Sequence, residues 1–335
     1  DDGLMHVTKD GGKNWKIITP AGEGIINSID VSPHDPGTVY ITLMKYKFND
    51  FLPYIYKSTN FGTNWSLITK GIPNRAYARV VREDPNRKNL LYAGTELGIY
   101  ISFDGGVQWS PFILNMPKAP ILDLMVHNND LLAATSGRAF WILDDLSPLH
   151  QLRDVIKNAN VYLYEPAEVI KTGAFFMDVP DVGAGKNPFP GASIKNYLKE
   201  VGENDTLPLT LEIMNNSREV LRTLSSDSKQ KWNKIGKKAG MNVGKWDLRR
   251  ANIEPTKGAF VASFDNSGYQ GYQVGPGSYL VKLTYGDYKL YINYAFTNTQ
   301  LLYENINNQK PLTPRHNAGF VLYYEVEDKW SAGYE

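Results

Sequence analysis

One eight-residue pattern occurs three times in the first third of the chain, and it restricts the fold more than any other feature. The pattern is Ser/Thr-x-Asp/Asn-x-Gly-x-x-Trp, found at 8–15, 58–65 and 102–109. Its Asx positions lie 50 and then 44 residues apart, near the period of a four-stranded propeller blade. The defining residues are Thr8, Asp10, Gly12 and Trp15; Ser58, Asn60, Gly62 and Trp65; and Ser102, Asp104, Gly106 and Trp109.

Short apolar runs around each box predict the strands of a blade. Turn residues such as Pro33 to Gly37 separate a first run from a second, a third run leads into the box, and the box Trp begins a fourth. We therefore expect residues 1–150 to form the C-terminal blades of a β-propeller. The first runs are 26–31, 78–82 and 121–126, and the second runs are 38–43, 90–93 and 131–134.

The residue types of the box fit a structural role. A Ser/Thr hydroxyl and an Asx side chain satisfy the backbone of a tight turn, Gly supplies a positive φ, and Trp packs between strands. We expect Asp10, Asn60 and Asp104 to hold turns, with calcium binding in the loop as the alternative.

Several longer segments carry a family resemblance. Residues 54–65, 91–98 and 136–145 resemble bacterial sortilin-type and glycosyl-hydrolase-like propellers with bacterial-neuraminidase, or Asp-box, repeats. Residues 187–192, 240–249 and 275–283 are similar to the C-terminal immunoglobulin-like domain of that group. The resemblance implies an all-β chain, a partial β-propeller followed by an immunoglobulin-like β-sandwich, and export from the cytoplasm. Ser136 departs from the group, which carries His before this Gly-Arg pair.

The repeat stops after Leu149, so the chain is expected to change domain there. Residues 151–194 are predicted as a linker with a candidate closing strand near 160–164. Hairpin patterns around 215–217 and 286–287 predict a sandwich over 195–297. Residues 298–335 fit no structural template.

Composition excludes several classes of function. The 36 Lys and Arg residues nearly balance 35 Asp and Glu, so nucleic acid is not an expected partner, and the lysines of 225–239 are read as a solvated insertion. No apolar run reaches the roughly 18 residues of a membrane helix. The absence of Cys excludes thiolate sites, and the five His lack His-Glu-x-x-His spacing. We therefore predict no metal site and no cofactor.

The register of the boxes also predicts a partner. It places the first residues in the loop between the second and third strands of a blade, so strand 4–8 lacks its inner neighbour. We expect an upstream fragment of the same precursor, or another chain, to complete the ring of blades.

The loops opposite the boxes form the candidate binding face. Asp50 and Glu96 are weak candidates for the acid and base of a glycosidase; the alternative is a solvated acid or an ion pair with Arg79 or Arg138. In the 45–50 insertion and just after it, four aromatic residues are candidates for stacking on sugars or anchoring a peptide: Tyr46, Phe48, Phe51 and Tyr54. The alternative is ordinary packing of the insertion. Arg138 is also expected to pair with Asp144 or Asp145. The predicted face comprises Lys45, Tyr46, Phe48, Arg75, Tyr77, Glu96 and Arg138.

These features favour an extracytoplasmic propeller that binds a protein, peptide or glycan through its loop face. The alternative is a glycoside hydrolase of the xyloglucanase type. A sialidase is less favoured, because Arg75, Arg79 and Arg138 lie on repeats that need not converge.

Overall fold

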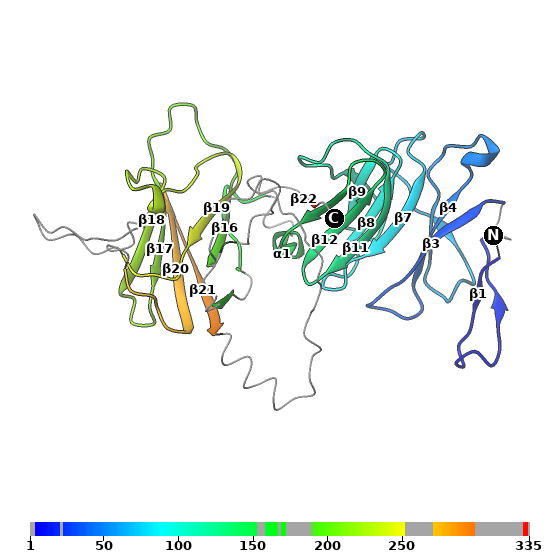
Figure 1. Cartoon of the computed structure of the whole chain (residues 1–335), viewed down its shortest axis with the longest axis horizontal. Helices are drawn as coiled ribbons and strands as arrows, with labels where there is room; N and C mark the ends of the chain where they lie inside the picture. The colour runs from blue at the N-terminus through cyan, green and yellow to red at the C-terminus, as the bar shows by residue number, and fades with distance from the viewer. Residues whose placement is uncertain are drawn as a thin grey trace, which may run out of the picture. The chain divides into compact units, whose positions relative to one another are not determined.

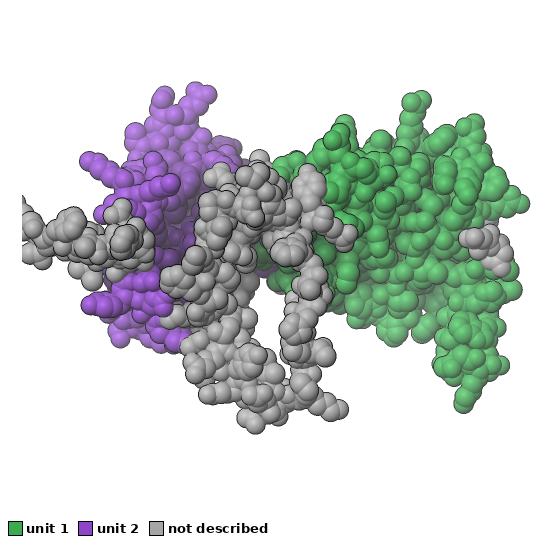
Figure 2. Space-filling model, in the orientation of Figure 1, with its two compact units in different colours: residues 1–146, 183–186, 319–335 green, residues 147–182, 187–318 purple. Residues whose placement is uncertain are grey.

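The computed structural model describes residues 4–20, 23–152, 158–166, 169–171, 189, 191–251, 271–298 and 331–333. These residues divide into two compact units, coloured separately in Figure 2. The first contains residues 1–146 and the last strand, and the second begins at Ser147. The named helical elements are short, η1 (Tyr46–Phe48), α1 (Ser147–Gln151) and η2 (Lys231–Asn233), and strands dominate the described residues, so the fold is all-β as predicted.

The first unit is a series of antiparallel sheets of the blade type (Figure 1). The second and third blades carry the predicted order of strands, with the box between the third and fourth strands of each. The second blade is β3 (Ile25–Val31), β4 (Val39–Met44), β5 (Ile55–Ser58) and β6 (Ser66–Leu67). The third blade is β7 (Ala78–Glu83), β8 (Leu91–Thr95), β9 (Gly98–Ser102) and β10 (Ser110–Pro111).

The first blade contributes only its two outer strands, β1 (His6–Val7) and β2 (Lys16–Ile17). Backbone hydrogen bonds show which strands of the two blades correspond. The amide of Ile18 donates to the carbonyl oxygen of Met5, just as the amide of Ile68 donates to that of Ile55. The first two-stranded sheet therefore corresponds to β5 and β6 of the next blade.

The fourth blade takes its outer strand from the end of the chain. It consists of β11 (Ile121–His127), β12 (Asp130–Thr135), β13 (Phe140–Leu143) and β22 (Ser331–Gly333). The candidate closing strand near 160–164 does form, as β14 (Val161–Leu163), but it pairs with β16 of the second unit instead of a blade. That part of the expectation is wrong, because the edge of β13 is paired with β22.

The second unit is a β-sandwich of two sheets around one apolar core. One sheet has the order β14-β16-β19, and the other has the order β15-β21-β20-β17-β18. Strand β16 alternates buried and half-buried residues along its length, as a strand with one face on a core must. The remaining bounds are β15 (Val169–Lys171), β16 (Ala192–Leu198), β17 (Leu209–Met214), β18 (Val220–Ser225), β19 (Gly240–Trp246), β20 (Gly277–Tyr285) and β21 (Tyr288–Asn298).

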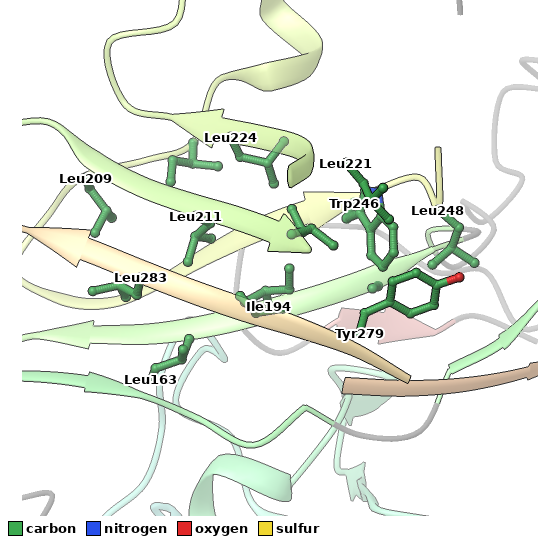
Figure 3. Close-up of a cluster of buried hydrophobic side chains, with 14 of the residues drawn as sticks. Leu163, Ile194, Leu209, Leu211, Leu221, Leu224, Trp246, Leu248, Tyr279 and Leu283 are labelled. Carbon is green, nitrogen blue, oxygen red and sulfur yellow. The ribbon is translucent and has the colours of Figure 1, made fainter. Parts of the chain in front are cut away.

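Trp246 and Tyr279 anchor this core with an edge-to-face ring contact at 5.3 Å, beside Leu248 and Leu221 (Figure 3). The buried indole of Trp246 donates to the carbonyl oxygen of Arg249. Strands β14 and β15 belong to this unit although they lie in the range predicted as linker. Most of the Gly/Pro-rich run 179–191 lies outside the described residues.

Candidate functional site

The loop face of the second and third blades gathers aromatic side chains from two loops. The insertion between β4 and β5 begins with η1, whose turn ends at Asn49 in the left-handed conformation. This turn places the ring of Tyr46 in a stacked arrangement with Tyr77, with ring centroids 5.4 Å apart. Phe51, from the same insertion, lies 6.3 Å from the Tyr77 ring. Two loops from neighbouring blades therefore meet through their aromatic residues.

An ion pair adjoins this aromatic cluster. Arg79, at the start of β7, donates from Nε and Nη2 to the same oxygen of Glu96, at 3.1 and 2.8 Å. Its Nη2 also donates to the hydroxyl of Tyr77 at 2.8 Å, and the guanidinium lies 5.1 Å from the Tyr77 ring centroid. Burial, followed by hydrogen bonding to Glu96, raises the pKa of Tyr77. Arg79 is the alternative partner that the sequence offered for Glu96.

Asp50 is held within its own loop. The Tyr54 hydroxyl donates to one carboxylate oxygen at 2.7 Å, and the amide of Leu52 donates to the other at 3.0 Å. The hydrogen bond from Tyr54 lowers the pKa of Asp50, and the same bond raises the pKa of Tyr54 to about 12. A general acid of a glycosidase needs a raised pKa, so the local environment shifts Asp50 in the opposite direction.

The other predicted face residues lie on several loops of the first unit. The ammonium of Lys45 lies 4.8 Å from the ring centroid of Tyr54. Phe48 is 60% exposed, and Arg75 is exposed in the turn before β7. Arg138 is exposed in the turn between β12 and β13 of the fourth blade, and its carbonyl accepts from the indole of Trp141.

Arg79 was not assigned to the face from the sequence, although a signal existed. It is a charged residue between buried neighbours, Ala78 and Val80, at the start of an inner strand. A charge at such a position needs a partner, and Glu96 supplies it.

The boxes lie at the opposite end of the strands from the loop face. The loops of that face come just before β5 and β9, and the boxes begin where β5 and β9 end. In the first box the hydroxyl of Thr8 donates to Asp10 at 2.9 Å and accepts from the amide of Gly12 at 2.8 Å. The amide of Asn14 then donates to the same carboxylate oxygen of Asp10 at 3.0 Å. Ser58 with Asn60, and Ser102 with Asp104, make the same contacts.

The Ser/Thr and Asx side chains of each box thus accept hydrogen bonds from backbone amides of their own turn. Within the described ranges, no group of three His, Asp or Glu side chains is placed to hold a metal ion. No helix there is long and apolar enough to cross a membrane.

Comparisons with known proteins give one relative by sequence and several by structure. No protein-family profile matches the chain. The xyloglucanase Xgh74A of Acetivibrio thermocellus is 35% identical in an alignment of 198 residues that covers 54% of this chain and 23% of that enzyme. The chain therefore spans about a quarter of the length of this relative.

Among solved structures, the GH74 enzyme of Niastella koreensis has a TM-score of 0.35 at 12% identity, over 88% of this chain and 43% of that one. YCF48 from Cyanidioschyzon merolae has a TM-score of 0.33 at 14% identity, over 99% of this chain and 86% of that one. The sheets of the first unit and the similarity to a xyloglucanase together describe a propeller module.

Proposed function

We propose that the first unit is an extracytoplasmic propeller module whose loop face binds a glycan chain of the β-glucan type. The loop face is defined here as residues 45–52 with Tyr77, Arg79 and Glu96. The observation that carries the proposal is the stack of half-buried Tyr46 on buried Tyr77, with the exposed ring of Phe51 beside Tyr77 and Phe48 exposed in the same insertion.

The chemistry of such a face suits sugar rings. Aromatic rings offer flat apolar area to the C–H faces of a pyranose at little cost in side-chain entropy. Glu96 and Arg79, half-buried beside the rings, offer an acceptor and donors to sugar hydroxyls. The sequence similarity to a xyloglucanase favours a glucan over a peptide as the ligand.

Hydrolysis is the second candidate, and the same similarity favours it. The two carboxylates available on this face argue against it, because Glu96 is paired with Arg79 and the pKa of Asp50 is lowered. Binding without cleavage is therefore the stronger proposal for residues 1–146. Export from the cytoplasm is part of the proposal, since such polysaccharides are extracellular.

Binding is tested by calorimetric titration of residues 1–335 with xyloglucan oligosaccharides, with mannan oligosaccharides as a second ligand class. Replacing Phe48 and Phe51 together by Ala should weaken binding of the glucan about tenfold or more, because both rings are exposed and each stacked ring contributes roughly 0.5–1.5 kcal/mol. The matched control is Val107→Ala, an equally exposed apolar residue at the box end.

Equal affinity for wild type and the double variant would overturn the proposed face. A reducing-end assay on the same oligosaccharides separates the two functions. Cleavage that is lost in Asp50→Asn or Glu96→Gln would replace binding by hydrolysis.

A further inference from the structure

Successive blades in this protein are joined by the same contact. The indole of Trp65 donates to the carbonyl oxygen of Ile18 at 2.7 Å, and the indole of Trp109 donates to that of Ile68 at 2.6 Å. In each case the acceptor lies just after the fourth strand of the preceding blade.

The box glycine completes this contact. A Cβ added to Gly62 would lie 2.5 Å from the Cδ1 of Ile18, and one added to Gly106 would lie 2.5 Å from the Cδ1 of Ile68. The box Gly and Trp of one blade therefore form a seat for an Ile of the blade before it. The positive φ that the turn requires and the close approach of the Ile both select glycine there.

The first box has the same seat without an occupant among the described residues. A Cβ on Gly12 would meet only the ring of Trp15, at 3.9 Å. Trp15 is 62% exposed, against 1% for Trp109, and its indole donates within its own turn to Gly12.

The inner side of the first blade is also uncovered. Strand β1 pairs with β2 and, in the described part of the chain, with no other strand, whereas β5 and β9 each pair with an inner neighbour. Ile29 is 53% exposed, although its counterparts in the third and fourth blades, Val81 and Leu124, are 0% and 1% exposed.

An apolar groove of about 120 Å³ marks this uncovered side. Figure 1 shows β1 next to β3 at the end of the first unit where the N-terminus lies. The groove is lined by Met5, Val7, Ile18, Ile29, Val31 and Val39, among others.

We propose that this end of the first unit is a docking surface for one further Asp-box repeat. In the docked repeat, the Ile that follows the box packs on Gly12 and Trp15. The two strands after that Ile complete the first blade: the second of them pairs with β1, and together they cover Ile29. Both uncovered sites lie one repeat apart, so a single continuous segment fills both. The two occupied contacts inside the chain, Ile18 with Trp65 and Ile68 with Trp109, are the pattern for this interface.

The chain itself supplies a test segment. Residues 58–94 contain a box, Ile68, β7 and all of β8 except Thr95. A copy fused directly before Asp1 keeps the register, because Met5 corresponds to Ile99. In the fusion, amides of 5–7 and 29–31 should exchange at least about tenfold more slowly than in residues 1–335.

Glycine substitutions give a second readout. In residues 1–335, Gly62→Ala should lower the melting temperature far more than Gly12→Ala. Gly12→Ala should resemble Gly11→Ala, since a Cβ on Gly11 meets nothing within 4 Å and one on Gly12 meets only the ring of Trp15, at 3.9 Å. In the fusion, Gly12→Ala should become as harmful as Gly62→Ala. Replacing the copied Ile68 by Ala should reverse this change.

Three results would overturn the proposal. The first is unchanged exchange at 5–7 in the fusion. The second is a copy that stays unfolded beside a folded 1–335, because the same sequence folds on Gly106 and Trp109. The third is a dimer of residues 1–335 in light scattering that Trp15→Ala dissociates, because a second copy would then be the occupant.

Discussion

The indole nitrogen of Trp109 donates a 2.6 Å hydrogen bond to the carbonyl oxygen of Ile68, a residue of the preceding blade. Trp109 is also 1% exposed and belongs to the apolar cluster that contains Tyr40, Val81 and Tyr100. One side chain therefore fills the space between two blades and satisfies a carbonyl group at their junction. The box is thus a joint between blades as well as a turn.

The three box tryptophans should differ in their contribution to stability. Trp109→Ala should lower the free energy of unfolding by about 3–5 kcal/mol, because it opens a cavity and leaves a carbonyl without its donor. Trp65→Ala should act in the same direction, and Trp15→Ala should change stability by under about 0.5 kcal/mol. Urea denaturation measures all three. Unchanged stability of the Trp109 variant would contradict the role of this joint.

Asp10 should remain ionised to low pH. Hydrogen bonds from the backbone and side chain of Asn14, and then from Thr8, lower its pKa from 3.8 to about 2. A lowered pKa in the folded state stabilises the first turn above pH 3.8, and this contribution is lost as the pH falls towards 2. Carboxyl NMR titration measures the midpoint. Asp10→Asn should remove the acid dependence yet keep the turn, since Asn60 holds the same position in the second box.

Tyr54→Phe should raise the pKa of Asp50, because it removes the hydrogen bond that lowers it most. Conversely, Asp50→Asn should bring the pKa of Tyr54 down from about 12. NMR titration of the labelled side chains tests both changes. Tyr56→Phe is the matched control for the Asp50 titration, since Tyr56 stacks on Tyr54 but is not among the groups that shift the pKa of Asp50. An unchanged Asp50 titration in Tyr54→Phe would show that the loop is held differently.

Trp246 should be the most sensitive aromatic position of the sandwich. Trp246→Phe should cost about 1–3 kcal/mol, because the indole is fully buried and donates to Arg249. Trp232→Phe, in the lysine-rich insertion, should change stability by under about 0.5 kcal/mol, since Trp232 is 56% exposed. Thermal unfolding compares the two. Equal losses would contradict the assignment of the core.

The strands of the first three blades could be predicted because a box marks the turn between the third and fourth strands of each. A box fixes where one strand ends, so the apolar runs around it had one consistent arrangement, with β3 to β10 following it. The sandwich followed from hairpin patterns such as the one between β20 and β21. In both cases the informative contacts lie close together along the chain.

Pairing between strands that lie far apart in the sequence could not be predicted in this way. Strand β22 is three residues long and lies far from β13 in the sequence, so no local pattern indicates its partner. Strand β14 has an apolar alternation that would fit either unit. On the loop face, Tyr46 and Tyr77 come from different blades, and only the turn of η1 brings their rings together.

The joint between blades has a direction that matters during synthesis. Trp65 binds Ile18, and Trp109 binds Ile68, so each box completes its packing on residues translated earlier. A ribosome releases the N-terminal residues first, and domains can fold as they emerge. The second and third blades thus each meet a surface that is already outside the ribosome, whereas the fourth blade is complete only after β22, near the end of the chain, has been made.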